Sequence, residues 1–576
     1  MRYPTLNEIP TTREMIDSFG GYNHNLRIGA GEFYDMQNLT SAHYPVLSTR
    51  PRRGIFATPT APQGLIAKDA LCYVDGGDFV MGEYRVSMGL TKDNAPKTLI
   101  SMGAYVIILP DKKYINTADI SDYGSIEAVV TTTTAATFEL CKIDGTGYSD
   151  AVAQDTEPST PANMDLWIDT SATPHTLKMY SSTNAMWVSI ATTYIKISAT
   201  GLGKPFNVGD GVSISGVSAA ADLNSTMIIW DKGDDYIVVT GIIDRVTTQE
   251  APITVARRMP NMDFVIESRN RLWGCRYGTD VNGNMVNEIY ASKLGDFKNW
   301  NSFAGISTDS YAVTVGTDGQ FTGAITHLGY PIFFKEGCMH KVYGDSLPFG
   351  VQDTACRGVQ KGCGGSLAIV NEVLYYKSRS AVCAYDGSLP AEISTALGEV
   401  NYSDAVAGAV GNKYYISMKD SDGAYHLFSY DTAKGMWHRE DSTQATAFCA
   451  CRGDLYFIDA ADRKIKTVMG TGTQDSAPVK WMAETGLIGT DSPDKKYISR
   501  LDVRMSISLG TSVDFYIQYD SEDRWDMLFS VDGHTLRSFT IPIRPQRCDH
   551  FRIRMEGNGP AKVYSICKNI EQGSEV

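Results

Sequence analysis

The sequence lacks the signals of several protein classes. No stretch approaches the roughly 20 consecutive apolar residues that a membrane-spanning helix needs. The first residues, from Met1 to Thr5, lead into no apolar segment of the kind that a secretory signal contains. The 3.6-residue periodicity of amphipathic helices is nearly absent. We therefore expect a β-rich protein that is folded in a cytoplasm and has no membrane anchor.

Cysteine patterns that would form a metal site are also missing. The chain has 11 cysteines, an odd number, and several of them lie within apolar segments. Cys449 and Cys451 share one face of a strand but form only one such pair, and a structural zinc site needs four ligands. Cys338 and His340 are two residues apart, with no second histidine close by in the sequence. We predict no disulfide, no metal and no cofactor.

Positive charge is scarce relative to negative charge. The 52 basic residues are outnumbered by 66 acidic ones, and the formal net charge is −14. This balance does not suit a protein that holds nucleic acid through its phosphates. The acidic residues are spread along the chain, which is typical of a soluble surface.

Catalytic signatures are absent as well. A glycosidase needs clustered carboxylates, and a sialidase uses a tyrosine nucleophile. The acidic runs at 231–235 and 520–523 lie in turn-rich segments, where carboxylates are normally solvated. The sialidase turn motif has no match, because the nearest string, at 530–535, lacks its tryptophan. We find no nucleophile elbow and no phosphate-binding loop. The sequence therefore predicts that the chain is not an enzyme.

What the sequence does contain is a recurring aromatic hairpin. A polar turn leads into an apolar-aromatic segment, and a second one returns about ten residues later. The last four such units begin about 41 residues apart, at Ile332, Leu374, Tyr415 and Tyr456. A period of about 40 residues with one hairpin per period is typical of β-propellers, in which each repeat forms one small sheet.

The repeats divide the chain into five predicted parts. Residues 1–60 read as an extended arm, and residues 61–124 as the first part of a propeller. The hairpin period stops over residues 125–252, which we predict to be one or more inserted β modules, because loops tolerate insertions. The propeller resumes over residues 253–475. Alternating apolar and polar residues over 476–576 predict a C-terminal β-sandwich.

Two groups of residues are candidates for binding. Arg50, Arg52 and Arg53 close the arm, and we predict an assembly contact with another subunit or an adaptor there. A solvated basic turn is the alternative. Trp167 and Trp187 of the insert could stack on sugar rings, but core packing of a small β module is the interpretation we favour.

Several phrases resemble one family of phage virion proteins. These are the tail tubular protein B, or nozzle, of short-tailed phages and the related packaged-DNA stabilisation protein. The resemblance rests on the phrase at 289–300, which includes Leu-Gly-Asp-Phe-Lys-Asn-Trp, and on the segments at 36–39, 44–51, 271–274, 385–388 and 430–437. The insert is similar, at 165–170 and 177–180, to a small module of phage tail proteins.

The resemblance implies a ring of subunits, typically six, below the portal and adaptor proteins. Such a ring carries the DNA exit channel and contacts other tail proteins or fibres. We therefore expect a structural protein of the virion tail that is assembled in the host cytoplasm and lets genomic DNA pass without specific binding. The alternatives are a glycan-binding receptor protein and, third, a propeller glycosidase.

Overall fold

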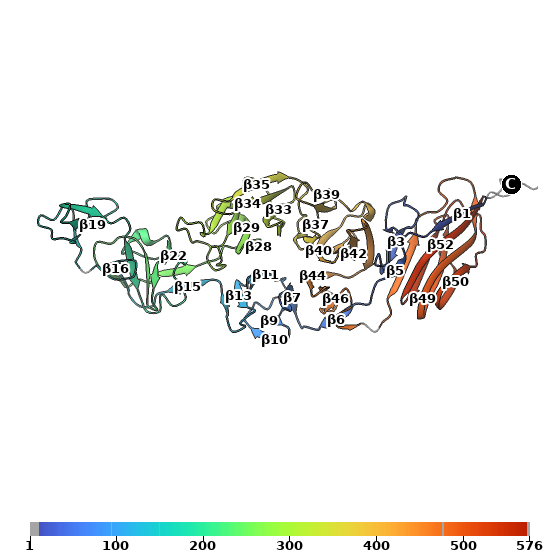
Figure 1. Ribbon diagram of the computed structural model, residues 1–576, viewed down its shortest axis with the longest axis horizontal. Coiled ribbons are helices and arrows are strands. Elements are labelled where there is room, and N and C mark those ends of the chain that lie inside the picture. The colour runs from blue at the N-terminus through green and yellow to red at the C-terminus, as the bar shows by residue number, and fades with distance from the viewer. Residues whose placement is uncertain (1–10, 94, 149, 475–476, 573–576) are drawn as a thin grey trace, which may run out of the picture.

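The computed structural model describes residues 11–572, apart from 94, 149 and 475–476. Nearly all of its regular structure is strand, and the described helices are three single 3₁₀ turns: η1 (Ala221–Leu223), η2 (Gly364–Ser366) and η3 (Thr395–Leu397). The molecule is elongated, with the insert at one end, a ring of small sheets in the middle and long strands at the other end (Figure 1). The predicted fold class is confirmed: an all-β propeller, interrupted by an inserted β module and followed by a C-terminal sandwich.

The ring is a propeller of seven small sheets, or blades. Blades 1 and 2 precede the insert, and blades 3 to 7 follow it. In chain order their strands are β7 (Pro62–Ala67), β8 (Leu71–Asp75), β9 (Asp78–Met81), β10 (Tyr84–Ser87); β11 (Thr98–Met102), β12 (Tyr105–Leu109), β13 (Lys113–Asn116), β14 (Tyr123–Ser125); β28 (Phe264–Ser268), β29 (Arg271–Thr279), β30 (Met285–Ala291), β31 (Tyr311–Thr314); β32 (Gly323–His327), β33 (Tyr330–Lys335), β34 (Cys338–Tyr343), β35 (Gly350–Ala355); β36 (Ala368–Val370), β37 (Val373–Lys377), β38 (Val382–Tyr385), β39 (Ala391–Glu392); β40 (Ser403–Val410), β41 (Lys413–Lys419), β42 (Tyr425–Asp431), β43 (Met436–Asp441); and β44 (Ala445–Cys451), β45 (Asp454–Asp459), β46 (Ile465–Thr467).

The aromatic hairpins form the interior of the ring because each blade is covered on both faces. In β41, Tyr414 and Ile416 pack toward one neighbouring blade, whereas Tyr415 packs toward the other. Fully burying one such side chain stabilises the fold by about 1.5–3 kcal/mol. This two-sided burial explains why the strands read as continuous apolar runs rather than as alternating ones.

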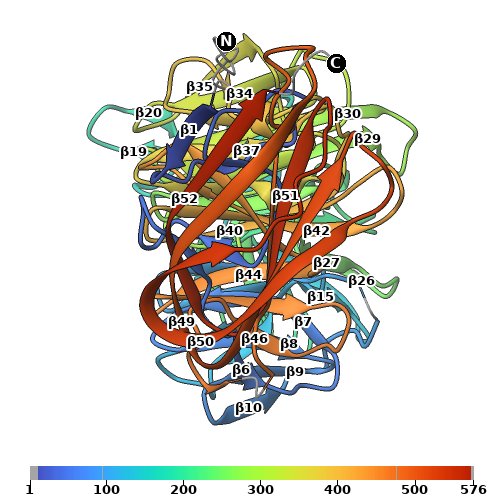
Figure 2. The same ribbon diagram turned by 90° about the vertical axis from the view of Figure 1, so that its right-hand side faces the viewer.

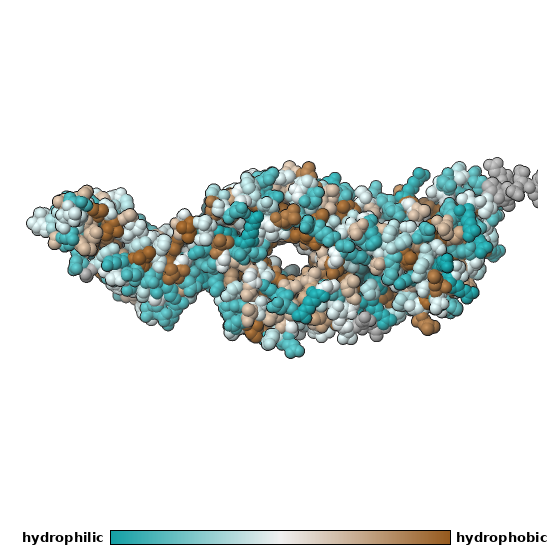
Figure 3. Space-filling view, viewed as in Figure 1, coloured by the Kyte–Doolittle hydropathy of each residue, from teal (hydrophilic) through white to brown (hydrophobic). Residues whose placement is uncertain are grey.

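A strand from the N-terminal part of the chain closes the ring. β6 (Gly54–Ala57) pairs antiparallel with β46 of blade 7 and with β47 (Thr473–Gln474). The innermost strand of blade 7, β44, contacts both β7 of blade 1 and β40 of blade 6. The first and last parts of the propeller are thereby joined, and a central opening remains visible (Figure 3).

The insert lies between blades 2 and 3. Its ends meet where β15 (Ala128–Thr131) pairs with β27 (Thr254–Arg257). Its sheets share one apolar core, to which Ile168 and Leu177 of the third sheet, β17-β18-β19-β20, also contribute; this sheet is inserted between β16 and β21. The remaining strands are β16 (Ala136–Cys141), β17 (Val152–Gln154), β18 (Leu166–Asp169), β19 (Thr176–Ser181), β20 (Met186–Ser189), β21 (Tyr194–Ser198), β22 (Gly211–Ser215), β23 (Thr226–Ile228), β24 (Asp231–Lys232), β25 (Tyr236–Thr240) and β26 (Thr247–Gln249).

A buried polar joint holds the insert against blade 3. Asp210 of the insert forms an ion pair with Arg257 and accepts a hydrogen bond from the Asn299 side chain at 2.9 Å. The Asn299 side-chain oxygen Oδ1 accepts a hydrogen bond from the backbone N–H of Gly211 at 3.0 Å. Asn299 belongs to the Leu-Gly-Asp-Phe-Lys-Asn-Trp phrase, whose Phe297 and Trp300 are buried beneath it. The phrase therefore fixes the direction in which the insert projects.

The N-terminal segment and the C-terminal strands form one structure. Its strands are β1 (Thr11–Ile16), β2 (Gly21–Tyr22), β3 (Glu32–Gln37), β4 (Leu39–Thr40), β5 (Leu47–Thr49), β48 (Lys480–Thr485), β49 (Lys496–Tyr519), β50 (Asp526–Ile541), β51 (Phe551–Asn558) and β52 (Ala561–Gln572). β49 and β50 are long and pair with each other, and β49 also pairs with β52 in its first half and with β51 in its second (Figure 2). β2 and β3 bridge β43 of blade 6 to β48.

Residues 11–57 therefore do not form a free arm. The segment that we predicted to be extended contributes strands to the sandwich, to the bridge and to blade 7. Their partners, such as β46 and β52, lie more than 400 residues away in the sequence. Short polar strands whose partners are so distant leave no local signal, which is why they read as irregular.

Candidate functional site

The predicted arginines lie at the junction of the N-terminal segment with blade 6. Arg53 contacts Glu440 and Asp441, both at 3.0 Å, and Arg50 contacts Asp441 at 3.2 Å. The two arginine side chains are each 10% exposed and Glu440 is 3% exposed. Burial by itself would raise the pKa of Asp441, but Arg53 and Arg50 outweigh it and hold that pKa below its ordinary value.

Arg50 and Arg53, two of the predicted assembly residues, are thus engaged with blade 6 of the same chain. Arg50 and Arg53 tie the N-terminal segment to the propeller. Arg52 is half-buried and lines, together with them, a hollow of about 400 Å³ at this junction. A contact of Arg52 with another subunit stays a prediction.

The tryptophans predicted to stack on glycans form the centre of the third sheet of the insert. Trp167 is 5% exposed, and its indole N–H donates to the Gln154 carbonyl at 2.9 Å. The Trp187 ring packs edge-on against the Trp167 ring, with 5.5 Å between the ring centroids. The Lys178 ammonium lies over the Trp167 ring, 4.5 Å from its centroid. The rings of Trp167 are therefore occupied by protein, and Trp187 is the more exposed of the two. Glycan binding stays a prediction.

A cavity between blades 2, 3 and 4 has one carboxylate in its lining. Its volume is about 590 Å³, and its lining includes Thr98, Leu109, Met262, Val265 and Ala324. The one carboxylate that lines it is Asp263, which accepts a hydrogen bond from the backbone N–H of Tyr277 at 2.9 Å. Glycoside hydrolysis normally uses a pair of carboxylates on either side of the bond.

The C-terminal sandwich exposes two strand edges. β1 pairs with β52, and β50 pairs with β49; no further strand pairs with either in the part of the chain that the structure describes. In this half of the sandwich β1 and, beyond it, β5 lie along one side of β52, and β50 lies along the far side of β49, so β1 and β50 are strands on opposite borders. Open strand edges are ready templates for another strand, and natural proteins usually protect them.

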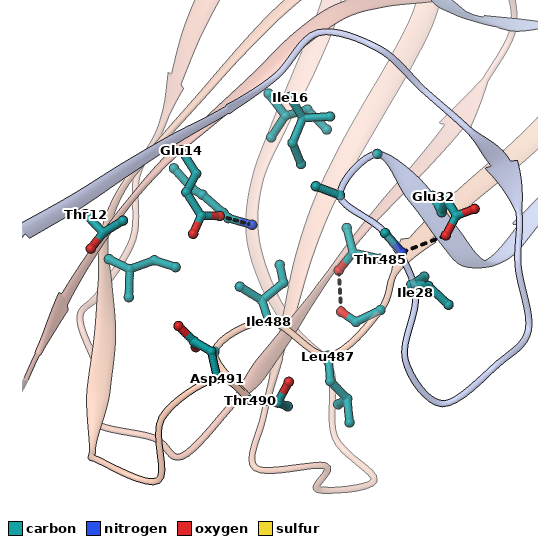
Figure 4. A pocket seen from close by; sticks show the side chains of 18 of the residues that line it. Thr12, Glu14, Ile16, Ile28, Glu32, Thr485, Leu487, Ile488, Thr490 and Asp491 are labelled. Carbon is teal, nitrogen blue, oxygen red and sulfur yellow. Dashed lines mark hydrogen bonds and ion pairs between the residues drawn. The ribbon is translucent and has the colours of Figure 1, made fainter.

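The side chains of β1 alternate between the interior and the surface. Thr12, Glu14 and Ile16 face a cavity of about 350 Å³ between the two sheets (Figure 4). Glu14 forms an ion pair there with Lys568 at 2.9 Å. Met15, on the other face, is 66% exposed. β1 is thus anchored by its inner face while its outer border remains accessible.

Exposed apolar side chains accompany the β50 border. Met527, Phe529 and Leu536 are 57%, 42% and 48% exposed, and Leu509 in the adjoining bend of β49 is 97% exposed. The alternation over 476–576 predicted strands here but did not show that β50 runs over 16 residues as a border. The alternation rule identifies a strand, yet whether it lies at a border depends on distant partners.

The described residues show neither a metal cluster nor a membrane-spanning helix. Among the residues that the structure describes, no three His, Cys, Asp or Glu side chains gather where they could hold a metal ion. No helix within that same part of the chain has the length and apolar character to cross a membrane.

Comparisons with known proteins give fold likeness only. No family model and no curated protein matches the sequence. Solved structures that are similar include an exo-β-1,3-galactanase from Phanerochaete chrysosporium (9% identity, 53% of this chain, 94% of that chain, TM-score 0.21) and a GH43 glycoside hydrolase (9%, 54%, 96%, 0.20). Trypanosoma rangeli sialidase is similar over 82% of this chain and 90% of its own, at 9% identity and a TM-score of 0.18.

These comparisons correct one prediction. We expected that the chain is not an enzyme, whereas the similar structures are glycoside hydrolases and a sialidase. The prediction that the chain is not an enzyme is therefore wrong. At this level of similarity the comparisons identify no substrate and no catalytic residue, and Asp263 is the one carboxylate that lines the cavity between blades 2, 3 and 4.

Proposed function

We propose that this chain is a structural subunit of a phage tail or connector, which joins copies of itself into a ring around the path of the genome. The observation that carries the proposal is the pair of open borders, β1 and β50, on one sheet of the sandwich. The resemblance of residues 289–300 and the segments named with them to the nozzle family supports the position in the tail.

The directions of the two borders are complementary. β52 is antiparallel to both β1 and β49, and β49 is antiparallel to β50. β1 and β50 therefore run in opposite directions, so β1 of one copy meets β50 of the next as an antiparallel neighbour. The six residues of β1 match the half of β50, residues 534–541, that borders the same sheet.

A second copy of this chain is the occupant that satisfies both borders. A foreign strand would cover one of them and leave the other open. A contact between two different patches of the same protein is head-to-tail, and such contacts close into rings when the rotation per subunit allows it. Pairing also covers Met15 and Leu536, which are exposed in the single chain.

Two further features suit a conduit for DNA. The Asp210–Arg257–Asn299 joint and the Arg50 and Arg53 contacts connect insert, propeller and sandwich through buried polar groups, which favours a rigid subunit. The net charge of −14 disfavours adhesion to phosphate, so passing DNA is not retained.

The test is the mass of the particle in solution, measured by light scattering on the wild type and on single lysine variants of each border. We expect a closed ring for the wild type, and monomers for Leu536→Lys and Met15→Lys, because each charge blocks strand pairing at one border. Val281→Lys is the matched control: Val281 is fully exposed on blade 3, far from the sandwich in sequence, and the ring should persist.

Mixing the two border variants identifies the head-to-tail geometry. Leu536→Lys retains an intact β1 border, and Met15→Lys retains an intact β50 border, so an equimolar mixture should form a dimer and nothing larger. A wild type that stays monomeric, or a mixture that does, would overturn the proposal. Negative-stain imaging of the ring with a portal–adaptor complex then tests its position in the tail.

A further inference from the structure

A cysteine, a histidine and an aspartate converge on one hairpin of blade 4. Cys338 begins β34, His340 follows two residues later on the same face, and Asp353 of β35 is the cross-strand partner of His340. The His340 Nδ1 lies 2.5 Å from an Asp353 carboxylate oxygen, and the His340 Nε2 lies 3.8 Å from the Cys338 sulfur. Neither an inserted loop nor a second sheet is needed to bring these groups together.

The hydrogen bonds determine which imidazole nitrogen can act as a base. His340 is fully buried, and burial lowers its pKa, so the ring is neutral at pH 7 and carries one proton. Asp353 as a carboxylate only accepts, which places that proton on Nδ1. Nε2 therefore offers its lone pair to the two donors near it, the Cys338 thiol and the Thr317 hydroxyl, which lies at 2.9 Å.

A buried cation stands beside the thiol. Lys335, the β33 partner of Cys338, is 2% exposed, and its ammonium donates to the Asn287 side chain and to the Thr317 carbonyl at 2.9 and 2.7 Å. Within the described part of the chain no carboxylate lies within 4.0 Å of this ammonium. A thiolate at Cys338 would give the buried charge an anionic neighbour.

The other accessible cysteines lack such surroundings. Eight of the 11 cysteines are buried, and Cys356 and Cys449 are half-buried like Cys338. Burial raises the pKa of Cys356 to about 11 and that of Cys449 to about 12, so both remain thiols at neutral pH. They serve as internal references of comparable exposure.

We propose that Cys338, His340 and Asp353 form a base-assisted nucleophilic thiol whose substrates are small disulfides. The His340 Nε2 takes the proton from the Cys338 sulfur, and the thiolate attacks one sulfur of the disulfide. The bond between the Cys338 sulfur and that atom forms while the original S–S bond breaks, and the departing thiolate takes the proton from His340. One thiol and one disulfide are consumed and one of each is formed, so no outside oxidant is required.

Thiol–disulfide exchange is the reaction for which the groups present suffice. Acyl transfer would in addition need hydrogen-bond donors aimed at a developing oxyanion, whereas exchange needs a thiolate and a proton for the leaving group. The site does not depend on the proposed ring, because all of its residues lie in blades 3 and 4 of one chain.

The experiment exposes the full-length protein to oxidised glutathione at pH 7 and follows the mixed disulfide at each cysteine by mass spectrometry. We expect Cys338 to react at least about tenfold faster than Cys356 and Cys449. Asp353→Asn should remove this advantage, because an amide no longer holds the Nδ1 proton in place. Thr317→Val should increase the rate, because the valine no longer competes for Nε2.

Each of the three measurements tests the proposed nucleophilic thiol. Equal rates at the three cysteines, an unchanged rate in Asp353→Asn, or a Thr317→Val variant that is no faster would overturn the proposal. Near-UV circular dichroism reports whether the variants keep the native packing. If either variant fails to fold, the rate ratio among the three cysteines of the wild type decides alone.

Discussion

The contact of Arg50 and Arg53 with blade 6 allows a quantitative prediction. Glu440→Gln removes one of the two charges that these arginines share, at a site where Glu440 is 3% exposed. Breaking a buried ion pair costs about 3–5 kcal/mol, because a charge is left in low dielectric without its partner. Asp441 still pairs with both arginines, so we take the lower bound, about 3 kcal/mol, for the free energy of detaching the segment that precedes β6.

The assay is hydrogen exchange of the backbone amides of β6, whose pairing with β46 depends on that attachment. A loss of about 3 kcal/mol in local opening free energy corresponds to roughly 100-fold faster exchange. Glu392→Gln is the matched control, since Glu392 pairs with Arg357 at 2.8 Å but both side chains are exposed. Exposed ion pairs contribute about 0–1 kcal/mol, so in Glu392→Gln the exchange of the amides near Glu392 should change less than about fivefold.

Equal effects of the two substitutions would refute the reasoning, because burial is the only factor argued to separate them. An unchanged rate in β6 with normal exchange in β18 and β19 would show that the pairing with β46 holds the segment without the arginines.

Two other predictions concern the junctions between the parts of the molecule. Asn299→Ala leaves Asp210 without one donor, so amides of β15 and β27 should exchange at least about tenfold faster while those of blade 6 do not change; equal exchange in both would contradict the joint. The pKa of Asp441 is depressed, so its contribution is present above the unfolded-state value of about 4 and is lost as the pH falls through the lower folded-state value. Proteolysis of the segment before β6 should therefore be constant from pH 8 to 5 and increase only below about pH 4; an increase near pH 6 would exclude Asp441 as its cause.

Much of the propeller was predictable because its signals are local. In each hairpin both strands and their turn lie close together in the sequence, as in the pairing of Trp273 with Ala291 or of Tyr414 with Tyr430, so apolar runs and turn residues predict it. The insertion was predictable because the hairpin period stops. Its strands nevertheless form three sheets, and their order could not be read from their spacing.

The candidate site was predicted less well. Arg50, Arg52 and Arg53 were chosen for their charge, but charge does not reveal whether the partner lies in the same chain. For Arg50 and Arg53 the partners are Glu440 and Asp441, nearly 400 residues away. Trp167 was weighed between stacking and packing, and its 5% exposure results from the fold of the third sheet of the insert.

The sequence by itself determined the class of this protein: strands throughout, hairpins at a propeller period, an insertion and a sandwich of longer strands. These properties follow from the alternation of side chains and from turn chemistry, which act between residues close in the chain. Tertiary structure alone decided which strands became borders, how β6 closes the ring, and that His340 and Lys335 are buried. Those outcomes depend on which surfaces exclude water from one another, and that is settled only when distant segments pack together.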